Sequence, residues 1–117
     1  MERYFTKAHV EIRERVADFA RRELEPIARA HDESGDFPWR TMGLIGRLGL
    51  LGVPVPVELG GMGLDTLSYI LVIEELAKVD ASHAITVSAH TTLGTSPILS
   101  FGTRKQRERF VPVLARG

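Results

Sequence analysis

"VPVPVELGGMGLDTLSYILVIEELAKVD", residues 53–80, leads from a turn-rich segment directly into the most apolar helix candidate of the chain. Its two prolines favour extended backbone, and the glycines within residues 60–63 permit left-handed geometry. Asp65 or Thr66 can cap a helix that then runs to about Val79. Because apolar side chains cover most of its circumference, we expect this helix to be central in the fold.

An amphipathic helix is predicted before this segment. Its apolar positions recur at three- and four-residue steps and comprise Ile12, Val16, Phe19, Ala20, Leu24 and Ile27. Pro26 is expected to kink this helix or to end its first part, because proline donates no backbone hydrogen bond. Residues 31–38, "HDESGDFP", are interpreted as a loop, and Asp36 as the start of a second helix that stops at Gly49 or Gly52.

The C-terminal third is predicted to be helical as well. One helix runs from about residue 82 to residue 93 and stops at Gly94, and a short one spans residues 96–102. Residues 103–106, "TRKQ", match the capping-box pattern at the start of a last helix, which Pro112 breaks or restarts. No strand alternation appears. The sequence therefore predicts an all-α fold, an orthogonal or up-down bundle of about six helices.

Composition limits the classes of function. The 117 residues fit one domain and are few for a complete cofactor-dependent enzyme. Fifteen basic and fifteen acidic residues balance, so no net charge favours nucleic acid or an anionic membrane. The absence of cysteine excludes disulfides, thiolate nucleophiles and cysteine-ligated metals. No apolar signal core follows Met1, and the uncharged run 81–103 is too polar for a membrane span, so we expect a cytoplasmic protein.

Three patterns that could carry chemistry have simpler interpretations. The glycines of "GGMG", residues 60–63, follow no strand and precede no Gly-Lys-Ser/Thr, which favours a structural turn over a phosphate loop. His83 and His90 are seven residues apart and too distant to bind one metal, so we interpret them as core or pocket-lining residues and expect no metal site. Glu74 and Glu75 point about 100° apart on a helix, and we expect one of them to form a salt bridge or a cap.

The segment "ASHAITVSAHTTLG", residues 81–94, contains only small, β-branched or weakly polar side chains, which are mediocre helix formers. Tertiary packing must therefore place this helix. Close contact with another helix explains the composition, and so does the smooth wall of an apolar ligand slot. Composition alone favours helix packing and leaves the ligand wall open.

Two stretches together resemble a known family. Residues 49–82, "GLLGVPVPVELGGMGLDTLSYILVIEELAKVDAS", and residues 93–117, "LGTSPILSFGTRKQRERFVPVLARG", are similar to the N-terminal helical domain of flavin-dependent acyl-CoA dehydrogenases. The resemblance covers most of the chain in the right order. It implies that residues 1–117 are the N-terminal α-domain, and that the middle β-domain and the C-terminal helical bundle of such an enzyme are absent.

The resemblance implies an activity for the longer enzyme. Members of this family remove a proton from the α-carbon of an acyl-CoA thioester and pass a hydride from the β-carbon to FAD. The reduced flavin then gives electrons to an electron-transfer flavoprotein, and the enzymes are usually tetramers. Because the catalytic glutamate and most FAD contacts lie in the other two domains, we expect no catalytic residue here, assign no cofactor-binding residue, and expect the isolated chain to be flavin-free and inactive.

What the resemblance carries over is one wall of the acyl-chain pocket, formed by Ile85, Thr86, Ala89 and Leu93. This favours the ligand-wall interpretation of the small-residue helix, and the small side chain of Ala89 leaves depth in the slot. The glutaryl-CoA branch carries an arginine at the position of Ala84, so its absence disfavours a dicarboxylic substrate. We expect a saturated monocarboxylic acyl-CoA with a short or branched chain.

Two hypotheses follow. The chain is a fragment of an acyl-CoA dehydrogenase, or it is a free-standing, non-catalytic helical binding or assembly module. The end at "LARG", residues 114–117, favours truncation, because a family member would enter its β-domain there. A fragment should expose an apolar face toward the missing domains, and we therefore expect it to self-associate.

Overall fold

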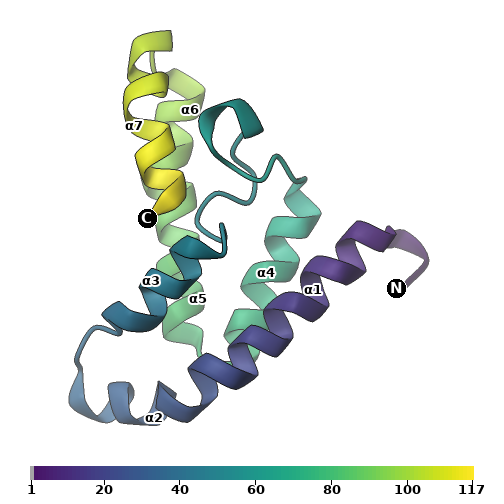
Figure 1. The fold of residues 1–117 in the computed structure, drawn as a ribbon, viewed down its shortest axis with the longest axis vertical. Helices are drawn as coiled ribbons and strands as arrows, with labels where there is room; N and C mark the ends of the chain where they lie inside the picture. Colours follow the sequence, from purple (N-terminus) through teal and green to yellow (C-terminus); the bar gives the residue numbers. More distant parts are fainter. Residues whose placement is uncertain (1) are drawn as a thin grey trace.

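The computed structural model describes residues 2–117, and every regular element in this range is helical. The α-helices are α1 (Lys7–Phe19), α2 (Glu25–Ser34), α3 (Trp39–Arg47), α4 (Thr66–Val79), α5 (Ala81–Ala89), α6 (Ser96–Phe101) and α7 (Arg104–Arg116). The shorter turns are η1 (Glu2–Tyr4) and η3 (Val57–Leu59), which are 3-10 helical, and η2 (Ala20–Leu24) and η4 (His90–Thr95), which are π-helical. The all-α prediction is confirmed. The molecule is flat, measuring 42 × 39 × 19 Å (Figure 1).

Helix α4 lies between α1 and α5 and forms the centre of the fold (Figure 1). Its N-terminus is capped by Asp65, whose carboxylate accepts a hydrogen bond from the Ser68 N–H, as the sequence predicts. Val72 and Leu76 are completely buried between the flanking helices, which confirms the central position. The side of α4 that carries Ile70 is not covered by either helix, as the 52% exposure of Ile70 indicates.

The apolar core has two parts. The main part joins α1, α3, α4, α5 and the segment after α3, and includes Ile12, Val16, Phe19, Leu24, Ile45, Val53, Val72, Leu76 and Val87. In the smaller part, Val111 and Ala115 of α7 pack with Val55. None of the helices within residues 2–117 is long and apolar enough to cross a bilayer.

Two long helical segments pass through π turns. Helices α1 and α2 are continuous through η2, and α5 and α6 are continuous through η4. At the end of η2 the Glu25 N–H donates to the Ala20 carbonyl, and at the end of η4 the Ser96 N–H donates to the Thr91 carbonyl. Each donor thus reaches five residues back, whereas an α-helical donor reaches four.

These π turns explain why the helix end expected at Gly94 is wrong, and why, of the kink or end expected at Pro26, the end does not occur. Pro26 follows the last residue of η2 by two positions, and Pro97 follows the last residue of η4 by two positions. In a regular α-helix the proline ring clashes with the carbonyl four residues earlier. The wider turn displaces that carbonyl, so the helix neither ends at Pro26 nor stops at Gly94. The two helices expected at 82–93 and 96–102 are therefore one continuous segment.

The connection between α2 and α3 also differs from expectation. Helix α2 continues to Ser34, and Gly35 ends it with a φ of 75°, so the loop is confined to residues 35–38. Helix α3 begins at Trp39 without a side-chain cap, which corrects the expectation that Asp36 starts it. Instead, the Asp36 carbonyl accepts a hydrogen bond of 2.8 Å from His31 Nδ1.

Helix α7 begins as predicted and ends later than predicted. The capping box between Thr103 and Gln106 is present. Pro112 does not break the helix, which continues to Arg116 because Val111 and Ala115 anchor that turn in the smaller core. The proline removes one backbone hydrogen bond, and burial on both sides of it outweighs that loss.

The glycine-rich loop before α4 folds back onto residues 52–55. The N–H groups of Met62, Gly63 and Leu64 donate to carbonyls of that segment at 2.9, 2.8 and 3.0 Å. A Cβ atom on Gly61 would lie 2.1 Å from the Val55 carbonyl oxygen, so only glycine fits there. These amides are used within the loop and are not available to a phosphate, which confirms the structural-turn interpretation.

Candidate functional site

The continuous segment α5–η4 presents two opposite faces. One face carries His83, Ala84, Val87 and Thr91 and is buried against the core. The other face carries all four residues that the sequence analysis assigns to the site: Ile85, Thr86, Ala89 and Leu93. Ile85 is 64% exposed and Leu93 is 77% exposed, so this face has no partner within residues 2–117. We refer to these four residues as the α5 stripe.

The π turn aligns the α5 stripe. Residues four apart on an α-helix drift around the axis, because one turn takes 3.6 residues. Ile85, Ala89 and Leu93 are spaced by four, and η4 begins directly after Ala89. A π turn contains more residues per turn than an α turn and therefore opposes this drift. A regular helix would rotate Leu93 about 80° away from Ile85 over two such steps, and the wider turn rotates it back toward the side of Ile85.

The exposed hydroxyl groups on this face bond to their own helix. Thr86 Oγ1 donates to the Ser82 carbonyl at 2.8 Å, and Thr92 Oγ1 donates to the Ser88 carbonyl at 2.7 Å. Each bond removes the only hydroxyl donor from the surface and leaves a methyl group there. The face is therefore less polar than its composition indicates.

Two open hollows border the stripe, one on each side. The first has a volume of about 390 Å³ and is lined by Tyr69, Ile70, Ile73 and Glu74 of α4 and by Ser88 of α5. The second has a volume of about 290 Å³ and is more polar, with Thr86 and Ser82 on one side and Asp36, Phe37, Pro38 and Asp80 among its other residues. Thr86 is the one stripe residue that lines either of these two hollows.

The remaining candidates take structural roles. Glu75 is buried and binds Lys78 Nζ at 2.6 Å, which raises the pKa of Lys78 and confirms the expected salt bridge. His83 is buried beside Asp80 and Thr41, and His90 Nε2 donates to the Leu114 carbonyl at 2.7 Å. His83 is a core residue, as expected, whereas His90 is half-buried and bonds to α7. No group of three potential ligands suited to a metal ion is present in the described part of the chain.

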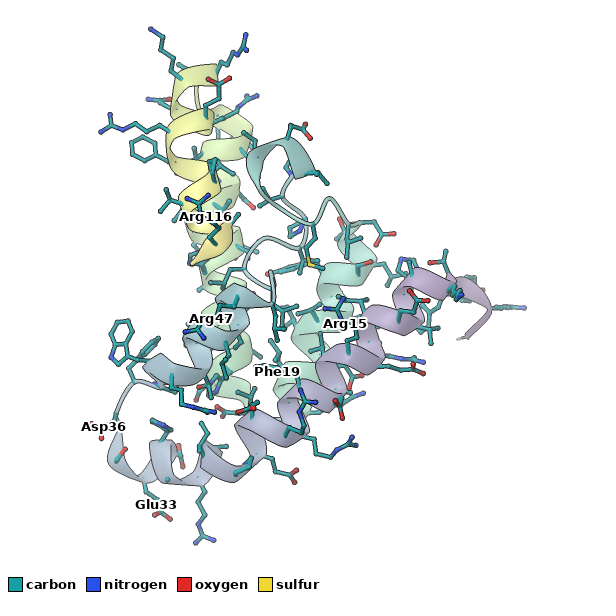
Figure 2. The ribbon with its side chains drawn as sticks, in the orientation of Figure 1. Arg15, Phe19, Glu33, Asp36, Arg47 and Arg116 are labelled. Carbon is teal, nitrogen blue, oxygen red and sulfur yellow. The ribbon has the colours of Figure 1, made fainter. Side chains whose placement is uncertain are left out.

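A separate hollow of about 170 Å³ lies between α1 and residues 48–50. Arg15 and Phe19 line it from α1 (Figure 2). Asp18 also lines it and is neutralised by Arg22 at 3.0 Å. None of the residues that the sequence analysis assigns to the site contributes to this hollow.

Helix α4 contributes to this surface in a way that the sequence does not predict. Ile70 and Tyr69 belong to an apolar run that predicts burial on all sides, yet they border the hollow next to the stripe. Their neighbour across the two helices is Ser88, whose carbonyl accepts a long hydrogen bond of 3.4 Å from the Tyr69 hydroxyl. The apolar run of α4 could have indicated this contribution, because α4 directly precedes α5 in the sequence. An apolar helix beside the stripe enlarges the apolar surface. The chemistry available here is apolar contact, because none of the four stripe side chains is ionisable.

Comparison with known proteins gives consistent matches. The family described as acyl-CoA dehydrogenase, N-terminal domain, matches residues 6–117. An acyl-CoA dehydrogenase of Bacillus subtilis (strain 168) is 40% identical over 114 residues, which are 97% of this chain and 30% of that protein.

Two solved structures share the fold. The butyryl-CoA dehydrogenase of Megasphaera elsdenii superposes with a TM-score of 0.90 at 36% identity, covering 96% of this chain and 30% of the other. An acyl-CoA dehydrogenase of Bacillus anthracis complexed with FAD has a TM-score of 0.88 at 36% identity, covering 96% of this chain and 19% of the other. The chain thus spans about a third or less of the length of these proteins.

Proposed function

The chain belongs to the acyl-CoA dehydrogenase family, in its N-terminal domain, and we propose that the α5 stripe forms one wall of an acyl-chain pocket in a longer FAD-dependent dehydrogenase. The observation that carries the proposal is the exposed line of Ile85, Ala89 and Leu93 on a helix of small residues. A helix with mediocre intrinsic propensity and an uncovered apolar face needs a second surface, and an acyl chain between two protein surfaces supplies it.

The proposed substrate class is a saturated, monocarboxylic acyl-CoA with a short or branched chain. The stripe offers methyl and methylene groups and no cation, so a terminal carboxylate on the acyl group would lose its hydration without gaining a partner. Ala84 itself is buried in the core, so the lack of a cation on the stripe is what disfavours a dicarboxylic substrate. Each methylene buried against it contributes about 0.8 kcal/mol. The small Ala89 leaves room for chain length or for a branch.

In the proposed enzyme, the catalytic base and the contacts to FAD and to the electron acceptor come from the other domains. The glycine-rich loop does not fit a flavin diphosphate, because its amides are bonded to residues 52–55. We therefore assign no flavin contact to this chain. When bound in the longer enzyme, FAD supplies the hydride acceptor, and an electron-transfer flavoprotein is the proposed oxidant of its reduced form. The proposed assembly is a homotetramer. Residues 1–117 alone are proposed to be inactive.

A domain exchange tests this function. The matching 114-residue segment of the Bacillus subtilis acyl-CoA dehydrogenase would be replaced by this chain, with the unaltered enzyme as the reference. We expect the chimera to retain flavin through gel filtration and to reduce an electron-accepting dye only when a saturated acyl-CoA is added. A chimera that folds and retains flavin but shows no acyl-CoA-dependent reduction would contradict the proposal. So would a stable flavin spectrum on residues 1–117 alone, because it would indicate a free-standing flavoprotein module.

A further inference from the structure

A buried chain of side chains fixes the first turn of α5. The His83 side chain is fully buried, and its Nδ1 contacts the Asp80 carboxylate. Its Nε2 lies 2.8 Å from Thr41 Oγ1, on the first turn of α3. Thr41 Oγ1 in turn lies 3.1 Å from the Pro38 carbonyl. The contacts therefore run from the α4–α5 corner through His83 to α3.

Asp80 holds three elements together at the other end of this chain. It is the last residue before α5 and the first after α4, and its N–H donates to the Leu76 carbonyl. Its side chain accepts a hydrogen bond of 3.3 Å from the Ser82 N–H and so caps α5. The carboxylate also binds His83. One residue thus ends α4, starts α5 and holds the imidazole.

The Thr41 hydroxyl has one proton and two acceptors within reach. It can donate to His83 Nε2, or it can donate to the Pro38 carbonyl and accept a proton carried by Nε2. The Pro38 carbonyl is satisfied in either case, because the Met42 N–H donates to it at 3.0 Å. The two arrangements differ by one proton on His83 Nε2 and by a rotation of the Thr41 O–H bond, and no heavy atom has to move. The Asp80–His83–Thr41 chain keeps all its contacts whichever arrangement it adopts.

The same helix face has a second histidine anchor. His90 lies seven residues after His83, and its Nε2 donates to the Leu114 carbonyl of α7 at 2.7 Å. Ile85 and Ala89 lie between the two anchors in sequence, on the opposite side of the helix from both. Since this segment has low intrinsic helix propensity, side-chain bonds at its two ends are what can fix its rotation and height.

We propose that His83 is a positioning residue for the α5 stripe, acting through Asp80 and Thr41. His83 does not touch the acyl group; it sets how far the stripe projects and which way it faces. This inference rests on the proposed function for its consequence in the enzyme, but the anchoring itself is a property of residues 1–117.

Amide hydrogen exchange on the 117-residue chain tests the anchoring. Thr41→Val keeps the shape and removes the hydroxyl, and Thr41→Ser keeps the hydroxyl. We expect Thr41→Val to accelerate exchange across α5 about fivefold to a hundredfold, because a buried polar group loses its partner, while Thr41→Ser stays close to the unaltered chain. Exchange in α1 should change much less. Equal effects of the two variants, or equal acceleration in α1 and α5, would overturn the proposal.

Proton NMR on the unaltered chain gives a test that does not depend on any variant folding. A buried imidazole N–H bound to a carboxylate gives a proton resonance downfield of the backbone amides. We expect one such signal from His83 Nδ1–H, lost in His83→Asn and shifted in Asp80→Asn. The signal of His9 Nε2–H, which faces Asp65, is the matched control and should persist in both variants. Absence of the His83 signal overturns the proposed contact between His83 and Asp80.

The consequence for acyl selection is read in the chimera described above. Thr41→Val should change the ratio of KM values between short and long acyl-CoA substrates, and Thr41→Ser should leave that ratio unchanged. A substitution at Ala89, inside the stripe, tests the proposed function separately. If the Ala89 variant shifts chain-length preference and Thr41→Val does not, positioning by His83 is wrong and the acyl wall stands. If neither shifts it, the acyl wall fails, and the exchange and NMR results still decide the anchoring.

Discussion

Asp65 binds His9 across 56 residues of sequence and thereby joins the starts of α1 and α4. Its two carboxylate oxygens lie 3.0 and 2.8 Å from His9 Nε2, and the same carboxylate accepts a hydrogen bond of 2.8 Å from the Ser68 N–H. His9 Nδ1 accepts from the Thr6 N–H at 3.0 Å, which closes the capping box of α1. Because Nδ1 is an acceptor, the proton on Nε2 faces Asp65.

Acid should weaken the fold through Asp65. Hydrogen bonds from the Ser68 N–H and hydroxyl, and then from His9, lower the pKa of Asp65 from 3.8 to about 2. A lowered pKa in the folded state means that the carboxylate stabilises the fold above pH 3.8, and that this contribution disappears as the pH falls toward 2. Urea midpoints measured from pH 5 to pH 2 should fall more steeply for the unaltered chain than for Asp65→Asn. Parallel curves would contradict this role.

Two glycines should respond oppositely to alanine. Gly61→Ala brings a Cβ to within 2.1 Å of the Val55 carbonyl oxygen, a backbone atom that cannot move aside freely. We expect a loss of about 1–3 kcal/mol in the free energy of unfolding. Gly43 lies within α3 with nothing within 4 Å of an added Cβ, so Gly43→Ala should stabilise by up to about 1 kcal/mol. Chemical denaturation of both variants checks this, and equal signs would refute it.

The two faces of α4 should differ in their contribution to stability. Leu76 is completely buried between helices, so Leu76→Ala should cost about 2–5 kcal/mol. Ile70 is on the uncovered side, and Ile70→Ala should cost about 1 kcal/mol or less. The measurement is the urea concentration at the midpoint of unfolding, compared between variants that have the same dependence of unfolding free energy on urea. A cost for Ile70→Ala similar to that for Leu76→Ala would show that a partner covers this face in solution.

The uncovered α5 stripe should promote self-association of residues 1–117. Leu93 is 77% exposed in line with other apolar groups, so we expect sedimentation velocity to show larger species at high concentration. Leu93→Glu should reduce them, because a carboxylate is costly to bury at an apolar contact. Val57→Glu, at an exposed valine on η3, is the control and should have less effect. A strict monomer at all concentrations would contradict this expectation.

Local rules were sufficient to predict much of the fold. The caps at Asp65 and Thr103 use side chains within three residues of the N–H groups they accept from, so the sequence states both partners. Gly49 has a φ of 80° just after α3, where the expected stop lies. These features depend on neighbours in sequence.

The features that sequence reasoning missed depend on distant neighbours. Pro26 and Pro112 do not end their helices, because a π turn or burial on both sides offsets the lost bond, and both effects require the tertiary fold. The exposure of Ile70 is set by which helices flank α4. The same limit applies to the site: His83 meets Thr41 across 42 residues, and no spacing rule relates them.

The most direct test of the acyl-wall proposal is the chain-length profile of the chimera with Ala89→Leu. Rates of dye reduction would be measured with a series of saturated acyl-CoA substrates, and Ala30→Leu, at an exposed position on α2, is the control. We expect Ala89→Leu to lower kcat/KM for the longer substrates by about fourfold for each methylene excluded, while the shortest substrate is little affected. A uniform fall for all substrates, or a profile identical to that of the control, would contradict the assignment of the α5 stripe as the acyl-chain wall.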